Sequence, residues 1–392
     1  MKNIRFFFIT NMFIGLSLQL LTTAVIAQPP CNEDAIMNTK GHWEKRSDAI
    51  VFPDSSFPKS QFPQANNRID KMQKILAAAY PDPKGIEAEW YRGITGNAVV
   101  KSGPVPYSLD ALFLPYFCNP YNQKGIEVNG ETSTWFYIWA NQVSGWFAEY
   151  EKYYRIQKQP VYLLQKKVGI LNGYPLYEGI YNGSGGSRYS RFIMIMRPGN
   201  SPYVPVTQKQ FLQAFLNYNE KRFAKSYQFQ LERSKHFKTE EEEEADKKKQ
   251  LENALRGAPP NRVEERKTNF LKNYKTDKQQ KEEWLIKLNK NYEEDMNPAH
   301  TLLDNGSPQE LEQSAILDFE NLLTFKHFSA EDQGGRELVR LNPDYFNTAL
   351  PKYIPQMLVV YWSWDKGKPG EYFREQIETH FDFNALKNML DK

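Results

Sequence analysis

The sequence is poor in the residues that build most metal and redox sites. It contains only two cysteines and five histidines in 392 residues. The histidines are scattered, and the chain has no His-Glu-x-x-His motif, no paired-cysteine zinc motif and no calcium-binding loop. Because such motifs set ligands at the spacing of a coordination sphere, we expect no metal site and no cofactor.

Long apolar runs are also scarce, and the one that exists lies at the N-terminus. Lys2 and Arg5 precede the apolar stretch Phe6–Leu21. Val25 and Ala27 then place short side chains at positions −3 and −1 of a cleavage site that follows Ala27. This order is typical of a secretory signal peptide. We predict that residues 1–27 are removed and that the chain is exported, to a periplasm or out of the cell.

The alternative interpretation of this stretch is an uncleaved anchor, since a membrane-spanning helix needs about 20 apolar residues. The polar residues Asn11, Ser17 and Gln19 argue against it. The sequence contains no later run of that length, so we predict no transmembrane segment after the signal peptide.

The chain has no excess of either charge. Its 50 basic residues stand against 47 acidic ones. Removal of Lys2 and Arg5 leaves 48 against 47, a net charge of +1. A nearly neutral chain has no general attraction to a phosphate backbone, so nucleic acid is not an expected partner.

Cys31 and Cys118 are the two cysteines. In an oxidising compartment an even pair predicts one disulfide, here between the new N-terminus and the first domain. A lipid anchor on Cys31 is the first alternative, but Gln28-Pro29-Pro30 does not fit that processing signal. A catalytic thiol is the second, and no histidine pairs with either cysteine in the sequence.

Residues 28–205 are rich in Gly, Pro, Tyr and Trp, with short β-type runs between turn signals. They predict an N-terminal α+β domain in which one helix packs on an antiparallel sheet of about four strands. The expected elements are a helix at Asn66–Tyr80 and strands at Thr132–Asn141, Val161–Ile170, Tyr174–Tyr181 and Tyr189–Met196.

Residues 206–297 change to a helical pattern. Thr207 and Gln210 form a capping-box pattern, and the apolar spacing then predicts one helix over Thr207–Arg256, about 75 Å long. Gly257 ends it, and Asn261 with Glu264 predicts a second capping box.

The second helix should return to about Asp295 and end at Asn297-Pro298. The two helices predict a long antiparallel hairpin, or coiled coil, that forms an arm with a polar distal half. The arm pattern favours contact with a partner protein or a component of the cell envelope.

Residues 298–392 regain a globular composition. We predict a helix at Pro308–Phe325, a buried strand at Gln356–Trp364 and a last helix at Tyr372–Leu390, with Asp382-Phe383-Asn384 as a candidate break. One strong strand cannot satisfy its own edges, so this C-terminal α+β segment should pack back on the first domain.

Paired carboxylates are the first candidate chemistry, because glycosidases use two acids about 5 to 9.5 Å apart. Glu87 and Glu89 would share one face of a strand, and Glu149 and Glu151 repeat the pattern. Alternating acids are equally typical of a strand that faces solvent. The glycine-rich stretch 182–187 fits neither a nucleophile elbow nor a phosphate loop, and predicts a flexible loop between strands.

Tryptophans are the second candidate, since exposed rings stack on sugars or on a protein partner. The candidates are Trp135, Trp139, Trp362 and Trp364, with burial in the core as the alternative for each. We therefore expect an exported, non-enzymatic interaction protein that uses the arm. The alternative is a glycan-binding protein or glycoside hydrolase with Glu87, Glu89, Trp135 and Trp139 at its site; no motif identifies the catalytic residues.

Overall fold

The structure is a computed structural model of the 392-residue chain. The predicted signal peptide lies outside the residues that it describes. The described residues are 31–51, 57–95, 100–119, 121, 125–142, 148–183, 186–318, 321–322 and 324–392.

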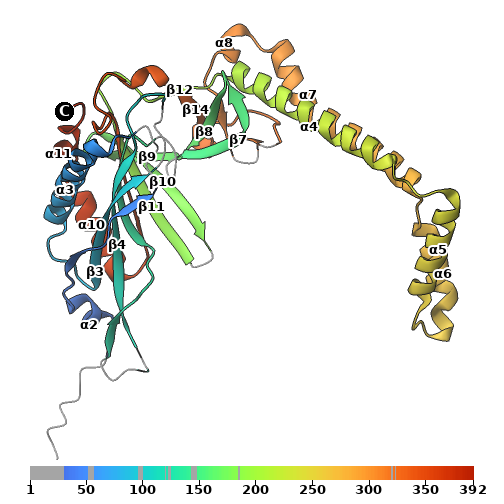
Figure 1. Ribbon diagram of the computed structural model, residues 1–392, viewed down its shortest axis with the longest axis horizontal. Helices are drawn as coiled ribbons and strands as arrows, with labels where there is room; N and C mark the ends of the chain where they lie inside the picture. The colour runs from blue at the N-terminus through green and yellow to red at the C-terminus, as the bar shows by residue number, and fades with distance from the viewer. Residues whose placement is uncertain are drawn as a thin grey trace, which may run out of the picture.

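A large twisted sheet forms the centre of the body, which is the part of the molecule outside the arm (Figure 1). Its strands follow the order β1-β3-β4-β6-β15-β11-β10-β9, with β2 added beside β3 and β5 beside β4. The strands are β1 (Trp43–Lys45), β2 (Ala49–Val51), β3 (Ile86–Thr95), β4 (Tyr107–Cys118), β5 (Ile126–Val128), β6 (Thr134–Ala140), β9 (Lys166–Leu171), β10 (Tyr174–Gly183), β11 (Gly186–Ile195) and β15 (Leu358–Trp364).

Strand β15 lies in the middle of this sheet, antiparallel to β6 on one side and to β11 on the other. All seven of its residues are buried. The α+β fold class is thereby confirmed, with the C-terminal segment as part of the main sheet. The expectation of about four strands was wrong, because β1, β2 and β15 join the sheet by pairing with segments far away in the sequence.

A smaller sheet has the order β12-β14-β8-β7, with β13 paired to β14. Its strands are β7 (Ala148–Ile156), β8 (Gln159–Leu164), β12 (Tyr203–Pro205), β13 (Ile316–Leu317) and β14 (Arg336–Leu341).

The single strand predicted at Val161–Ile170 is wrong, because the chain changes sheets within it. Its first half is β8 of the smaller sheet, whose last four residues are buried. Its second half is β9, an edge of the larger sheet that begins with the exposed Lys166 and Lys167. Apolar composition alone did not reveal the change of sheet.

The described helices are α2 (Glu33–Asn38), α3 (Phe62–Ala79), α4 (Gln208–Ser234), α5 (Glu240–Leu255), α6 (Val263–Asn273), α7 (Asp277–Asn305), α8 (Pro308–Leu311), α10 (Lys368–His380) and α11 (Phe383–Lys387). Helices α3 and α10 cover one face of the larger sheet (Figure 1). Their apolar stripes, which include Ile69, Met72 and Phe373, form the main core with Phe136, Val360 and other sheet residues.

Two further apolar cores stack the remaining layers. The opposite face of the larger sheet packs on the smaller sheet through Trp139, Phe192 and Val359 against Tyr162 and Val339. The other face of the smaller sheet carries the base of the arm, where Val161 and Leu163 of β8 meet the first turns of α4 and the last turns of α7. The arm is therefore rooted in a buried core.

The predicted disulfide is confirmed. Cys31 is bonded to Cys118, with their Cα atoms 5.7 Å apart. The bond fixes the start of α2 to the end of β4. Among the described residues, no helix is both long enough and apolar enough to cross a membrane.

The first helix of the arm is broken, which corrects the single helix predicted at Thr207–Arg256. The capping box of Thr207 and Gln210 is confirmed, but α4 ends at Ser234. A second capping box, Thr239 with Glu242, starts α5. The Thr239 hydroxyl accepts from Glu242 N, a backbone donor that a continuous helix would use for its own bond, so the chain stops and restarts there. Gly257 then ends α5 with φ of 70°, as predicted.

The returning helical segment of the arm, α6 and α7, differs from the prediction at both ends. Asn261 does not cap α6, whose N-cap residue is Arg262 without a side-chain bond. A further capping box, Thr276 with Gln279, starts α7. The predicted end at Asn297-Pro298 is wrong: Pro298 lies inside α7, next to the buried Ala299, so packing in the arm base outweighs the lost backbone hydrogen bond.

The helix predicted at Pro308–Phe325 is also wrong. Helix α8 (Pro308–Leu311) ends early, and β13 follows because Ile316 and Leu317 pair with β14. The last helix breaks where the sequence indicated, since the Asp382 side chain accepts a bond from Ala385 N and starts α11.

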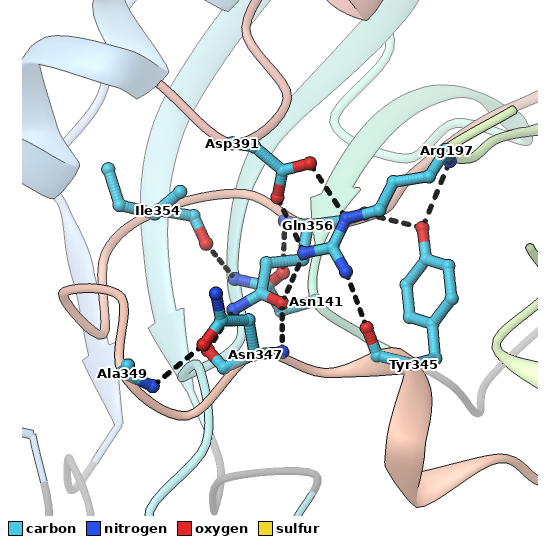
Figure 2. A network of polar contacts seen from close by, with 8 residues as sticks. All are labelled: Asn141, Arg197, Tyr345, Asn347, Ala349, Ile354, Gln356 and Asp391. Atoms are coloured by element: carbon cyan, nitrogen blue, oxygen red, sulfur yellow. Dashed lines mark hydrogen bonds and ion pairs between the residues drawn. The ribbon is translucent and has the colours of Figure 1, made fainter.

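A polar network holds the C-terminus to one end of the larger sheet (Figure 2). Asn141, with φ of 57°, donates to Ile354 O and accepts from Gln356 N. Arg197 bonds both carboxylate oxygens of Asp391, the Gln356 side chain and Tyr345 O. Because these groups satisfy one another, the network acts as a structural clamp.

Candidate functional site

The two predicted carboxylates lie on the same face of β3, as the alternation requires. Both are engaged. Glu87 accepts from His42 N at 2.9 Å and from the Tyr116 hydroxyl at 2.7 Å. Glu89 forms an ion pair with Arg46. Each carboxylate therefore has its own partner, and the two do not form a free acid pair of the kind that hydrolases use.

The predicted tryptophans of β6 lie on this same face of the sheet. The register pairs Glu89 with Leu112 of β4, and Leu112 with Trp135. Glu89 and Trp135 are thus separated by one strand, about 10 Å. Trp135 is partly exposed, whereas Trp139 is 5% exposed and belongs to the core below the smaller sheet. The structure brings Glu89 and Trp135 together and assigns Trp139 to packing.

Aromatic rings stack along β6. The ring centroids of Trp135 and Tyr137 are 5.7 Å apart with an interplanar angle of 11°, and those of Tyr137 and Trp139 are 4.9 Å apart at 15°. The Trp135 indole donates to Thr132 O. These contacts hold the rings upright on the sheet, so Trp135 presents a fixed orientation.

Asp110 is the group on this face that sequence reasoning missed. It lies between Tyr91 and Tyr137 in the register. Burial raises the pKa of Asp110 to about 6, against the opposing effect of hydrogen bonds from Ser108 and Tyr91. Burial and the neighbouring carboxylate raise the pKa of Tyr91 to about 12.

The space for this cluster depends on a glycine. A Cβ atom on Gly93 would lie 2.3 Å from the Ser108 hydroxyl oxygen, so only glycine leaves room for the Ser108 and Asp110 side chains. Asp110 Oδ1 is buried without a hydrogen-bond partner among the described residues. The available signal was one acid inside the apolar run of β4, Tyr107–Cys118.

The face around Glu89, Asp110 and Trp135 combines carboxylate acceptors with an aromatic ring. Such a combination can accept hydrogen bonds from hydroxyl groups while a ring contacts apolar C–H surface. Within the described ranges, no group of three or more His, Cys, Asp or Glu side chains is placed to hold a metal ion.

The remaining predicted residues have other positions. Trp362 and Trp364 are buried on the helix-covered face of the sheet, where their indoles donate to Glu378 and Glu371 of α10. Glu149 and Glu151 belong to β7, but their side chains lie outside the described ones. Gly183 and Gly186 pair at the tight end of the β10–β11 hairpin, so the glycine-rich stretch joins two strands.

The arm is the second candidate. Helices α4 and α7 pack side by side and carry the chain away from the body (Figure 1). The Phe223 and Tyr292 rings lie 4.4 Å apart, and Arg222 pairs with Asp295. Helices α5 and α6 pack together at the far end. We call residues 239–276 the distal lobe.

Both chain segments of the arm break at the same level, and the breaks form an elbow between α4/α7 and the distal lobe (Figure 1). Specific contacts define it. The ammonium group of Lys238 pairs with Asp246 at 2.6 Å, and this bond lowers the pKa of Asp246. The Glu243 carboxylate accepts from Asp277 N at 2.8 Å, and the Glu243 backbone carbonyl accepts from the Tyr274 hydroxyl at 3.2 Å.

The distal lobe has no interior of its own. Neither α5 nor α6 contains a buried residue. Its apolar side chains remain partly or largely exposed; they are Ala245, Leu251, Ala254, Leu255, Ala258, Val263, Phe270, Leu271 and Tyr274. Helix α6, with 11 residues, is shorter than the about 12 to 15 residues below which an isolated helix is marginal in water, and most helical stability comes from packing of an apolar face. The apolar side chains of the lobe therefore form one side of a core whose other side is open.

An open groove of about 520 Å³ runs between α5 and α6 down to the elbow. Ala254, Phe270 and Tyr274 supply its apolar surface. The other lining residues are polar: Lys238, Glu243, Asp246, Gln250, Arg266, Asn269, Asn273, Lys275, Asp277 and Gln280.

Comparison with protein-family models, with curated proteins and with solved structures found no match for this chain.

Proposed function

We propose that this chain is an exported, non-enzymatic binding protein whose arm carries the recognition surface at its distal lobe. The observation that carries the proposal is the absence of buried residues from α5 and α6, at the end of an arm that is itself firmly rooted. An uncovered apolar surface that is held away from the body, with polar residues around it, offers contacts to a partner.

Export is part of the proposal. It rests on the N-terminal sequence pattern, together with the disulfide between Cys31 and Cys118, which an oxidising compartment maintains.

The test is site-specific photo-crosslinking of the chain in its native cell envelope. A photoreactive residue at Gln250, which lines the groove, should give a discrete crosslinked product. The same residue at Lys166, on the exposed edge strand β9, should not. Equal products from both positions, or none from Gln250, would contradict the proposal.

A deletion provides the second arm of the test. Residues 235–277 are replaced by a short Gly-Ser linker, and the photoreactive residue is placed in the part of the arm that remains. This deletion should abolish the crosslinked product while leaving the thermal unfolding of the body unchanged. This outcome is expected because the three cores of the body contain no residue of that segment.

A second candidate function is glycan binding on the larger sheet, favoured by the placement of Glu89, Asp110 and Trp135 on one face. We propose binding rather than hydrolysis there, because Glu87 and Glu89 each have a partner. Calorimetric titration with oligosaccharides checks it. Trp135→Ala should remove the binding heat, and Phe117→Ala, at an exposed ring near the end of β4, should not.

A further inference from the structure

The distal lobe is electrically neutral but polarised along its length. The half next to the elbow, residues 239–247 and 271–276, contains six acidic and three basic residues, a net charge of −3. The tip half, residues 248–270, contains six basic and three acidic residues, a net charge of +3. Among the charged residues of the lobe that line the groove, the elbow half has Glu243, Asp246 and Lys275 and the tip half has Arg266, so the same polarity is present there with a net −1 and +1.

This polarity matches a second copy of the same lobe in antiparallel orientation. A two-fold axis across the lobe sets the elbow half of one copy against the tip half of the other, and the same contact then occurs twice. A parallel arrangement would instead bring like charges together. The pattern therefore favours one occupant and one orientation.

The apolar surface fits the same arrangement. Each copy has a groove with Ala254, Phe270 and Tyr274 exposed in it, and neither helix has a buried residue. Two such helical pairs placed groove to groove make a four-helix bundle, the usual way in which helical pairs bury their facing sides. Each lobe then supplies the half of the core that the other lacks.

We propose that the distal lobe pairs with the distal lobe of a second copy, antiparallel and groove to groove. This inference rests on the proposed function and names the partner of the arm. A lobe about 24 Å long and about 20 Å wide covers roughly 500 Å² per copy. The total of about 1,000 Å² is at the low end for specific interfaces, so the pairing is reversible and depends on concentration.

Sedimentation velocity of the chain from residue 28 onward, from about 1 to about 100 µM, tests the pairing. Two matched variants of α5 distinguish the effect of a new charge inside the groove from the effect of the same charge elsewhere on the helix surface. Ala254 lines the groove, whereas Ala245 is exposed and does not line it. Ala254→Glu puts a negative charge opposite the acidic elbow half of the other copy, and Arg266 lines the same groove of its own copy.

We expect a monomer–dimer equilibrium in which Ala254→Glu weakens dimerisation at least about tenfold and Ala245→Glu changes it less than about twofold. Raising the salt concentration should weaken the wild-type dimer, because the matched charges are exposed. Circular dichroism of both variants shows whether the helices persist, so a loss of dimer cannot be confused with a loss of the lobe.

A wild-type chain that stays monomeric up to about 100 µM would overturn the pairing, and so would equal effects of the two variants. A monomeric chain whose Gln250 position still crosslinks to a different protein would overturn this inference and leave the proposed function in place.

Discussion

The body and the distal lobe differ in what their helices bury. In the body, α3 and α10 follow an apolar stripe with residues such as Met72 and Phe373 that are completely buried. In the lobe, α5 begins at a capping box, α6 begins without a side-chain cap, and neither helix has a buried residue. Capping decides where a helix starts, whereas stability comes from what its face contacts.

Removal of the disulfide should give the largest difference in stability change between the body and the distal lobe. The Cys31 to Cys118 bond spans 87 residues of the body. Replacing both cysteines by serine should lower the free energy of unfolding of the body by about 4 to 5 kcal/mol, because the unfolded chain gains the entropy of that loop. Denaturant titration measures the loss. Hydrogen exchange in α5 and α6 should not change, and faster exchange there would show that the two regions are coupled.

Truncation of one aromatic residue in each region gives the next largest contrast. Trp362→Ala removes a fully buried ring from the centre of the larger sheet and should cost about 3 to 5 kcal/mol. Phe270→Ala in the lobe should cost less than about 1 kcal/mol in dilute solution, since its ring is only partly covered. Chemical denaturation of both variants checks this, and similar losses would contradict the difference in burial.

The pH dependence of the body should contain a contribution from Asp110. The pKa of Asp110 is raised from 3.8 to about 6. Between these two pH values, the folded state therefore holds a proton that the unfolded state has released. The stability that this proton contributes is fully present below about pH 4 and is lost as the pH rises through 6, by up to about 3 kcal/mol. The pH profile of Asp110→Asn minus that of the wild type isolates this effect. A flat difference would contradict the raised pKa.

The smallest effect concerns helix capping at the elbow. Thr276→Ala removes the capping box of α7 and should destabilise the arm locally by about 1 kcal/mol, measured as faster hydrogen exchange in the first turn of α7. Thr268→Ala, at an exposed position inside α6, should slightly stabilise the helix instead, because alanine has the higher helix propensity. Equal changes at both sites would mean that the capping box does not hold the elbow.

The sequence predicted the parts of the fold that depend on local signals. The capping box at Thr207, the end of α5 at Gly257, the break at Asp382 and the cysteine pair all follow from neighbouring residues or from a simple count. The Thr239 and Thr276 caps were present in the sequence as well, but the continuous charged pattern around them was interpreted as one helix.

The parts that could not be predicted depend on contacts between distant segments. The central place of β15 requires β6 and β11 on either side, more than 150 residues away in the sequence. The raised pKa of Asp110 depends on layers packed above and beside β4. At the candidate face, alternation correctly grouped Glu87 with Glu89, but only the register brought Trp135 beside them.

The account depends most on the claim that the distal lobe lacks a core until a second lobe supplies it. Hydrogen exchange of the whole chain, followed at low and at high protein concentration, tests this directly. We expect α5 and α6 to exchange orders of magnitude faster than β6 and β15 in dilute solution, and to become protected as the concentration rises. Protection of α5 and α6 equal to that of β15 in dilute, monomeric protein would contradict the account.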